Sequence, residues 1–301
     1  MSASLVSERC LSIDCQGERL LGIVATPDPD VPHAVGVVIV VGGPQTRVGS
    51  HRQFTQLSRH LAAAGHAVLR FDYRGMGDST GEAKGFEHAS DDIQAAMEAL
   101  RREVPAVEHI VLWGLCDGAS AALLFCQEHP SVPVAGLCLL NPWVRSPQTQ
   151  AATQIKHYYK KRLTERAFWL KLLRGQVGLG RLQELLRSAR TFLAGNADGG
   201  QGSAKTPRLT FQARMAAAWN AHSRPILLVL SSEDLTAKEF MEAMTSEPAW
   251  RGASAHPHLS RIDIQGADHT FSSASTQFEV ERATALWLAQ LDPSGVRQAT
   301  P

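Results

Sequence analysis

The chain has 301 residues, of which 44% are hydrophobic and 20% charged, and its net charge at pH 7 is +1. These proportions are ordinary for a soluble globular protein, and the length suits one large α/β domain or one domain with an insertion. No uncharged apolar run approaches the roughly 18–20 residues of a membrane span, and the first eight residues do not resemble a secretion signal. The five cysteines are an odd number without the spacing of a metal site, so we expect a cytoplasmic protein without metal or cofactor.

Strand-like and helix-like segments alternate along the first 140 residues. Residues 5–13 and 19–26 predict an antiparallel hairpin at the edge of a sheet. The β-branched run 35–41 is typical of a strand that is covered on both faces. Further strands are predicted at 67–71, 109–113 and 132–140, and helices at 54–64, 87–102 and 119–126.

The pattern changes after Pro142. Residues 145–215 combine basic and aromatic residues in helical segments and contain no convincing strand. Strands return at 225–230 and 259–264, and an amphipathic helix follows at about 275–290.

This order of segments predicts a mostly parallel, doubly wound α/β sheet of about eight strands that carries an inserted lid. The expected core comprises residues 1–144 and 216–292. A basic helical lid, 145–215, is inserted after the sixth strand, and the tail 293–301 is expected to be disordered.

A sharp turn follows the apolar run that ends at Trp113. Gly114 and Gly118 bracket Cys116 in a G-x-nucleophile-x-G pattern between a strand and a small-residue helix. This is the pattern of a nucleophile elbow, with cysteine where serine usually stands. The glycines leave room for neighbouring backbone, and the helix N-terminus favours a thiolate and a developing oxyanion.

A thiol nucleophile needs a base, and the base needs a partner that fixes its tautomer. The order nucleophile, acid, base is met by Cys116, Asp234 and His269, each directly after a predicted strand. Asp234 lies farther out on its loop than Glu233, which stays the alternative acid. His269 differs from the other histidines in following a late strand through a Gly-x-x-His turn.

The oxyanion hole is expected to use the backbone N–H of Asp117 and a second N–H from the loop Gly42-Gly43-Pro44-Gln45. Pro44 has no N–H, so Gln45 is our choice for the second donor. Gly43, Arg47 and Arg52 are candidate substrate-binding residues, although the two arginines are equally consistent with solvated loop residues.

Together these motifs resemble the α/β-hydrolase superfamily across nearly the whole chain. More narrowly, Gly-Gly-Pro-Gln at 42–45 with Val-Gly-Ser-His-Arg at 48–52, the loop 71–79 and the elbow 114–118 resemble the exosortase A system-associated hydrolases, type 1. The resemblance implies a hydrolase in a family that accompanies bacterial exopolysaccharide and protein-sorting loci. The chain departs from the superfamily pattern in carrying cysteine for serine and in lacking a histidine before the oxyanion glycine.

Attack of a thiolate on an ester or thioester gives an acyl-enzyme that can pass to water or to an acceptor held in the site. We therefore expect a hydrolase or acyltransferase. The alternative is a non-catalytic protein of the same fold that binds an acyl or saccharide ligand.

The predicted lid, 145–215, carries 14 Lys and Arg residues against three acidic residues, a net charge of +11, while the rest of the chain sums to −10. Such a segment is either a solvated helical face or a cap that receives an anionic substrate. Candidate partners are an acyl-CoA, an acyl carrier protein, or an anionic lipid-linked saccharide at the inner membrane face. No recognition motif accompanies the charge, so a nucleic acid is not expected.

Overall fold

The computed structural model describes residues 6–28, 34–145 and 209–291. The chain divides into two units, one made of Met1–Val144 with Leu209–Pro301 and the other of Arg145–Arg208. The predicted lid therefore lies almost wholly outside the described residues, as does the tail 293–301. The first unit resumes at Leu209 rather than at the predicted residue 216.

Eight strands form one sheet with the order β1-β2-β4-β3-β5-β6-β7-β8. The antiparallel pairs are β1–β2 and β2–β4, and the neighbours from β4 to β8 run parallel. The strands are β1 Ser7–Cys15, β2 Glu18–Thr26, β3 Val35–Val40, β4 Val68–Phe71, β5 His109–Leu115, β6 Gly136–Leu140, β7 Ile226–Ser231 and β8 Leu259–Ile264. This is the predicted α/β-hydrolase fold.

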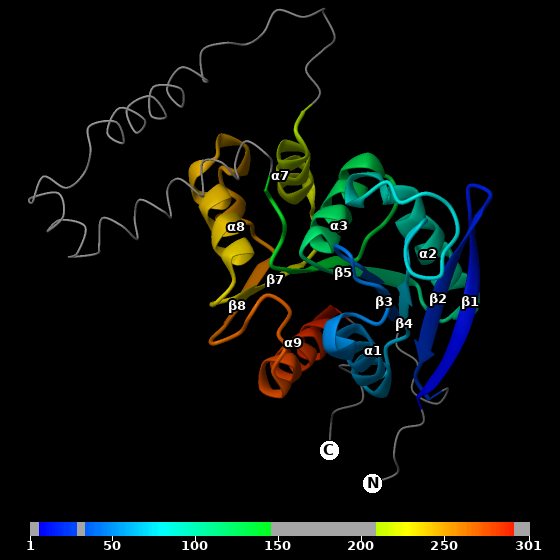
Figure 1. The fold of residues 1–301 in the computed structure, drawn as a ribbon. Coiled ribbons are helices and arrows are strands. Elements are labelled where there is room, and N and C mark those ends of the chain that lie inside the picture. Colours follow the sequence, from blue (N-terminus) through cyan, green and yellow to red (C-terminus); the bar gives the residue numbers. More distant parts are fainter. Residues whose placement is uncertain (1–5, 29–33, 146–208, 292–301) are drawn as a thin grey trace, which may run out of the picture. The chain divides into compact units, whose positions relative to one another are not determined.

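Helices cover both faces of the sheet (Figure 1). They are α1 Gln53–Ala63, α2 Ser90–Glu103, α3 Asp117–Glu128, α7 Phe211–Ala221, α8 Leu235–Ser246 and α9 Ala274–Leu291. Side chains of α1 and α9 share one apolar cluster with one face of the sheet, and those of α2, α3, α7 and α8 share another with the opposite face.

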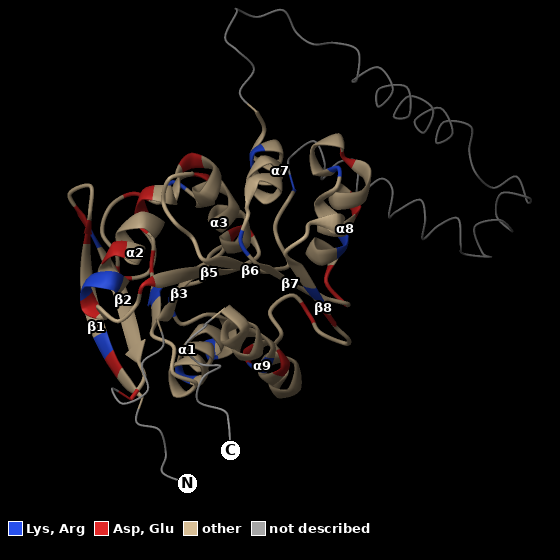
Figure 2. Cartoon of the chain, turned by 180° about the vertical axis from the view of Figure 1, so that it is seen from behind, with Lys and Arg blue, Asp and Glu red and all other residues tan. Residues whose placement is uncertain are grey.

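Strand burial follows the sequence pattern. All six residues of β3 are buried, as expected for a β-branched run covered on both faces. The strand predicted at 132–140 begins only at Gly136, because Pro133 cannot donate a ladder hydrogen bond. Figure 2 shows charged residues on the β1–β2 hairpin and the outer helices, whereas the central strands β5 and β6 carry none.

Helix α7 belongs to the core, although its first five residues, 211–215, fall in the predicted lid. Met215 and Trp219, four residues apart, are fully buried on one face of the helix. The indole Nε1 of Trp219 donates to the carbonyl oxygen of Ala253 at 3.1 Å. Arg214, whose charge suggested the lid, instead forms an ion pair with Glu128 at the end of α3.

The chain leaves and rejoins this core at adjacent points. The side-chain amide of Gln212, in the first turn of α7, donates to the carbonyl oxygen of Val144 at 3.2 Å, and this contact is buried. Among the described residues, no helix has the length and apolar character needed to cross a membrane.

Candidate active site

The three predicted catalytic residues follow the carboxyl ends of three parallel strands. Cys116 follows β5, Asp234 lies in the turn after β7, and His269 lies in the turn after β8. Since β5 and β8 are separated only by β6 and β7, these turns meet at one edge of the sheet. The structure brings all three side chains together.

Cys116 has a backbone conformation that non-glycine residues rarely adopt, with φ 60° and ψ −126°. A Cβ atom on Gly118 would lie 2.3 Å from the carbonyl oxygen of Val40, and one on Gly114 would lie 2.5 Å from the carbonyl carbon of Gly118. Both glycines are therefore required by direct backbone contact. The predicted elbow geometry is present, with Cys116 at the start of α3.

The carbonyl oxygen of Cys116 also fixes the loop after β6. It accepts hydrogen bonds from the backbone N–H of Ala119 at 3.1 Å and of Trp143 at 3.2 Å. The Ser120 hydroxyl donates to the carbonyl oxygen of Trp143 at 2.7 Å. These bonds hold the start of α3 and the loop beside it in one arrangement around the nucleophile.

Asp234 accepts a hydrogen bond from Nδ1 of His269 at 2.8 Å. It is also the N-cap of α8, because its carboxylate accepts from the backbone N–H of Thr236 at 3.1 Å and of Ala237 at 3.2 Å. Burial favours the neutral acid, but these hydrogen bonds and the imidazolium outweigh it and hold the pKa of Asp234 below its usual range. The alternative acid, Glu233, is exposed and accepts from the Ser232 hydroxyl instead.

The pKa of His269 is raised to about 10. The hydrogen bond to Asp234 is the largest cause and the interaction with Cys116 the second, and together they outweigh the effect of burial. Both Asp234 and Cys116 therefore favour the protonated form of His269.

Asn141 is a buried residue at this site that the sequence analysis did not single out. It has a positive φ of 43° and is fully buried. Its amide nitrogen donates to Ser231 Oγ at 2.7 Å and to the carbonyl oxygen of His269 at 3.1 Å, and its Oδ1 accepts from the N–H of Ser231 at 2.9 Å. The Ser231 hydroxyl in turn donates to the carbonyl oxygen of Asp268 at 2.8 Å. Asn141 thus ties β6 to the loops that carry the acid and the base.

The loop after β3 differs from the prediction in its second oxyanion donor. The backbone N–H of Gln45 donates to the carbonyl oxygen of Gly42 at 3.3 Å, so it is engaged in a turn. The N–H of Gly43, which has φ 57°, faces the side chain of Asp117. Burial raises the pKa of Asp117, and the N–H groups of Gly43, Asp117 and Gly118 offset that effect only in part. The N–H groups of Gly43 and Asp117 face the same carboxylate, so they lie close enough together to hold one oxyanion, and Gly43 replaces Gln45 as our candidate second donor.

Arg47 is engaged by two carboxylates and is not free to bind a substrate. Its guanidinium pairs with Asp72 and, at 2.6 Å, with Asp78, while its backbone N–H donates to Asp72 Oδ1 at 2.6 Å. Burial lowers the pKa of Arg47, but the two carboxylates outweigh it and raise the value. Arg47 therefore fastens the loop after β3 to the loop after β4.

Arg52 lies at the start of α1, with an exposed side chain and φ 63°. It forms no ion pair among the described residues, so it remains available to an anionic ligand. Its neighbour His51 is close enough to Asp268 to lower the pKa of that carboxyl, although burial acts against it and hydrogen bonds from Ser272 and Thr270 contribute more. This part of the loop therefore lies near the turn that carries His269.

No group of three or more His, Cys, Asp or Glu residues in the described ranges is arranged to hold a metal ion.

The sequence was compared with models of known protein families. The family model of the serine aminopeptidases, S33, matches residues 32–244, which is more than half of the chain. This chain belongs to that hydrolase family. It is an α/β-hydrolase. None of the curated proteins matches the sequence significantly.

Solved structures with the same fold share little sequence with this α/β-hydrolase. The Pyrococcus furiosus esterase Pf2001 matches with a TM-score of 0.61 and 16% identity, covering 94% of this chain and 92% of that one. Est1E from Butyrivibrio proteoclasticus, solved with ferulic acid bound, matches with a TM-score of 0.59 and 15% identity over 93% and 98% of the two chains. XC6422 from Xanthomonas campestris, described as an α/β serine hydrolase without lid, has a TM-score of 0.56 and 16% identity over 98% and 97%.

Proposed function

We propose that this α/β-hydrolase cleaves an ester or thioester, or transfers its acyl group, through an acyl-enzyme on Cys116. The observation that carries the proposal is the position of His269, which interacts with Asp234 on one side of its ring and with Cys116 on the other. A nucleophile, a base and a group that orients the base are the elements of covalent acyl transfer.

The protonation of His269 defines the first step. His269 accepts the proton of the Cys116 thiol, and its pKa, raised to about 10, favours the imidazolium that results. The thiolate attacks the substrate carbonyl carbon, and the carbonyl oxygen becomes an oxyanion that accepts hydrogen bonds from the N–H groups of Asp117 and Gly43. When the tetrahedral intermediate collapses, the bond to the leaving oxygen or sulfur breaks and His269 gives that atom its proton.

The second step returns the enzyme to its starting state. His269, now neutral, takes a proton from water or from an acceptor alcohol as that molecule attacks the thioester carbonyl. The carbon–sulfur bond then breaks and releases the Cys116 thiolate, leaving the proton on His269. Asp234 keeps Nδ1 protonated throughout, so that the other ring nitrogen faces the sulfur.

The substrate class follows from charge. Arg52 is an exposed arginine without an ion pair among the described residues, and residues 145–215 carry a net charge of +11 in the sequence. Both support an anionic acyl donor, such as an acyl-CoA or an acylated carrier protein. The resemblance to exosortase-associated hydrolases supports a role beside exopolysaccharide synthesis, in the cytoplasm at the inner membrane face.

A thiol-directed probe tests the proposal. Iodoacetamide should label Cys116 at pH 7 faster than the other four cysteines, and His269→Ala should slow this labelling strongly. Uncharged p-nitrophenyl esters and acyl-CoAs of short and long chains would then define the donor. A protein that binds acyl ligands but shows neither fast labelling nor turnover would be the non-catalytic alternative.

A further inference from the structure

A hollow lies at the opposite end of the parallel strands from Cys116. It is a cavity of about 820 Å³, lined by residues that precede β5, β6 and β7 and by the last residues of α3, α7 and α9. Strand β5, which has Cys116 at its far end, contains seven residues. At about 3.3 Å per residue the two ends of this strand lie ~20 Å apart. A small ligand in this cavity therefore does not reach Cys116.

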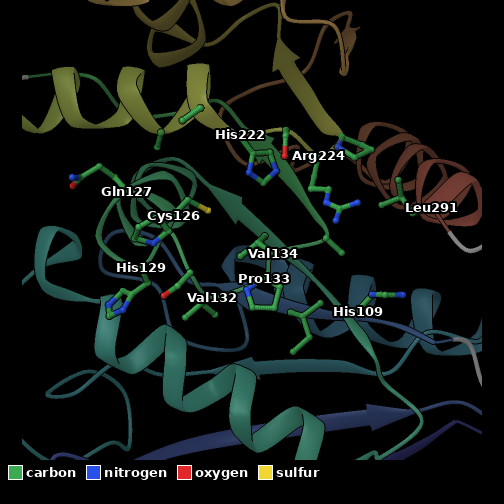
Figure 3. A pocket seen from close by; sticks show the side chains of 18 of the residues that line it. His109, Cys126, Gln127, His129, Val132, Pro133, Val134, His222, Arg224 and Leu291 are labelled. Atoms are coloured by element: carbon green, nitrogen blue, oxygen red, sulfur yellow. The ribbon is translucent and has the colours of Figure 1, made fainter.

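Polar and apolar side chains both line the cavity (Figure 3). Val132, Val134, Ala218 and Leu291 contribute apolar surface. Its volume lies within the range of about 300–1,000 Å³ that is typical of small-molecule sites.

His222 brings a buried nitrogen to this wall. Its Nε2 is buried and has no hydrogen-bond partner among the described residues, whereas its backbone carbonyl oxygen accepts from His256 at 2.8 Å. Burial is the main reason that the pKa of His222 is lowered to about 4, with contributions from His256, Arg224 and His258. The ring is neutral at pH 7. Buried polar atoms in folded proteins are usually paired, so this nitrogen indicates a missing partner.

Arg224 is the neighbour of His222 in the cavity (Figure 3). Its side chain is exposed, and it forms no ion pair in the described part of the chain. Among the described lining residues, Glu108 is the one acidic side chain, and it precedes β5 whereas Arg224 precedes β7. With β6 between them, these two strand starts lie roughly 10 Å apart. The end of the cavity at β7 is thus cationic.

We propose that this cavity binds a small monocarboxylate with an apolar body, at a site separate from the catalytic residues. The carboxylate pairs with the guanidinium of Arg224, and a rotation of the His222 ring brings its buried Nε2–H to the carboxylate. The apolar body lies against Val134 and Leu291. A planar guanidinium matches the two oxygens of a carboxylate, and charge-assisted hydrogen bonds of this kind are stronger than those between neutral groups.

Calorimetric titration of Cys116→Ala protein with octanoate at pH 7.5 tests the site without any turnover. Octanoate should bind, and octanol and octylamine, which share the alkyl chain but not the carboxylate, should bind at least tenfold more weakly. Adding Arg224→Gln should weaken octanoate binding about tenfold or more. His222→Phe, which removes the second donor while keeping a ring, should weaken it by a smaller factor.

Arg52→Gln is the matched control, because Arg52 is also an exposed arginine without an ion pair but lies near the other edge of the sheet. It should leave octanoate affinity unchanged. Loss of affinity in Arg52→Gln but not in Arg224→Gln would overturn the proposal, since the ligand would then occupy the catalytic edge. Equal affinities for octanoate and octanol, or no octanoate binding at millimolar concentration, would overturn it too. Because the nucleophile is absent from every sample, the result is independent of the function proposed for Cys116.

Discussion

Asp234 holds His269 and the first turn of α8 with the same carboxylate. Oδ2 accepts from Nδ1 of His269 at 2.8 Å and from the N–H of Ala237 at 3.2 Å, while Oδ1 accepts from the N–H of Thr236 at 3.1 Å. The helix therefore fixes the position of the carboxylate before any substrate arrives. A substitution that keeps the helix cap but removes the negative charge therefore tests what the carboxylate does in turnover.

Asp234→Asn should leave the fold intact and reduce turnover steeply. Asparagine caps helices about as well as aspartate, so the fold should be kept, although the stability linked to the raised pKa of His269 is lost with the carboxylate. Its neutral amide favours the wrong imidazole tautomer, and the corresponding change in a serine protease lowers kcat about 10⁴-fold. Steady-state kinetics with a p-nitrophenyl ester would measure the loss. Activity within a few-fold of the unmodified protein would mean that another residue orients His269.

The raised pKa of His269 predicts a pH-dependent part of the folding stability. The value in the folded protein is about 10, above the ordinary value of 6.5. A group with a raised folded pKa contributes fully below its unfolded pKa, and the contribution is lost as pH rises through the folded value. Urea unfolding should therefore show stability falling between about pH 6.5 and pH 10. His269→Gln should flatten this dependence, and an equally steep curve in that variant would assign it to other groups.

Arg47→Gln should destabilise the protein rather than weaken substrate binding. Asp72 is almost completely buried, and removing its partner leaves an uncompensated charge, which typically costs about 3–5 kcal/mol. Denaturant unfolding measures this change. Arg9→Gln is the control, because Arg9 pairs with Glu103 at the exposed surface, where such pairs contribute about 0–1 kcal/mol. A stable Arg47→Gln protein with a raised KM only for anionic substrates would restore the substrate-binding role.

Replacing Lys160, Lys161 and Arg162 with glutamine should raise KM for an acyl-CoA but not for an uncharged ester of the same acyl chain. We expect the charge of the segment 145–215 to raise the rate at which an anionic substrate meets the protein. Salt should weaken this effect because the Debye length falls from about 10 Å at 0.1 M to 3 Å at 1 M. Kinetics at several salt concentrations test this expectation. Equal effects on both substrates would point to lost packing of the lysine and arginine stems.

The positions of most strands along the chain could be predicted, and Cys116, Asp234 and His269 could be proposed as a catalytic set, because both depend on local patterns. Buried strands appear as apolar runs, and the elbow requires glycines on either side of Cys116. The role of Arg47 could not be predicted this way, since Asp72 is 25 residues distant and meets it only in the folded chain. Asn141 looked like the end of a strand, and its contacts with Ser231 and His269 depend on how β6, β7 and β8 lie together.

One predicted boundary and one predicted oxyanion donor differ from the structure, each for a physical reason. Residues 211–215, the start of helix α7, were included in the predicted lid, yet Met215 is fully buried in the core. Gln45 was chosen as a donor because Pro44 lacks an N–H, but its own N–H closes a turn on Gly42. In both cases the residue types are compatible with the prediction. The burial of Met215 and the hydrogen bond of the Gln45 N–H depend on contacts that the local sequence does not show.

The hydrogen bond between Gln212 and Val144 closes the core across the point where residues 145–208 depart from it. Because the chain leaves and returns at one place, the sheet and its three convergent turns form a complete topology without that segment. An insertion attached in this way can change in length and charge during evolution at small cost, since the entropy of closing a loop grows only slowly with its length. The composition of this segment can then change without altering the three turns that carry Cys116, Asp234 and His269. A short glycine-serine linker in place of residues 146–208 is the laboratory counterpart of such a change.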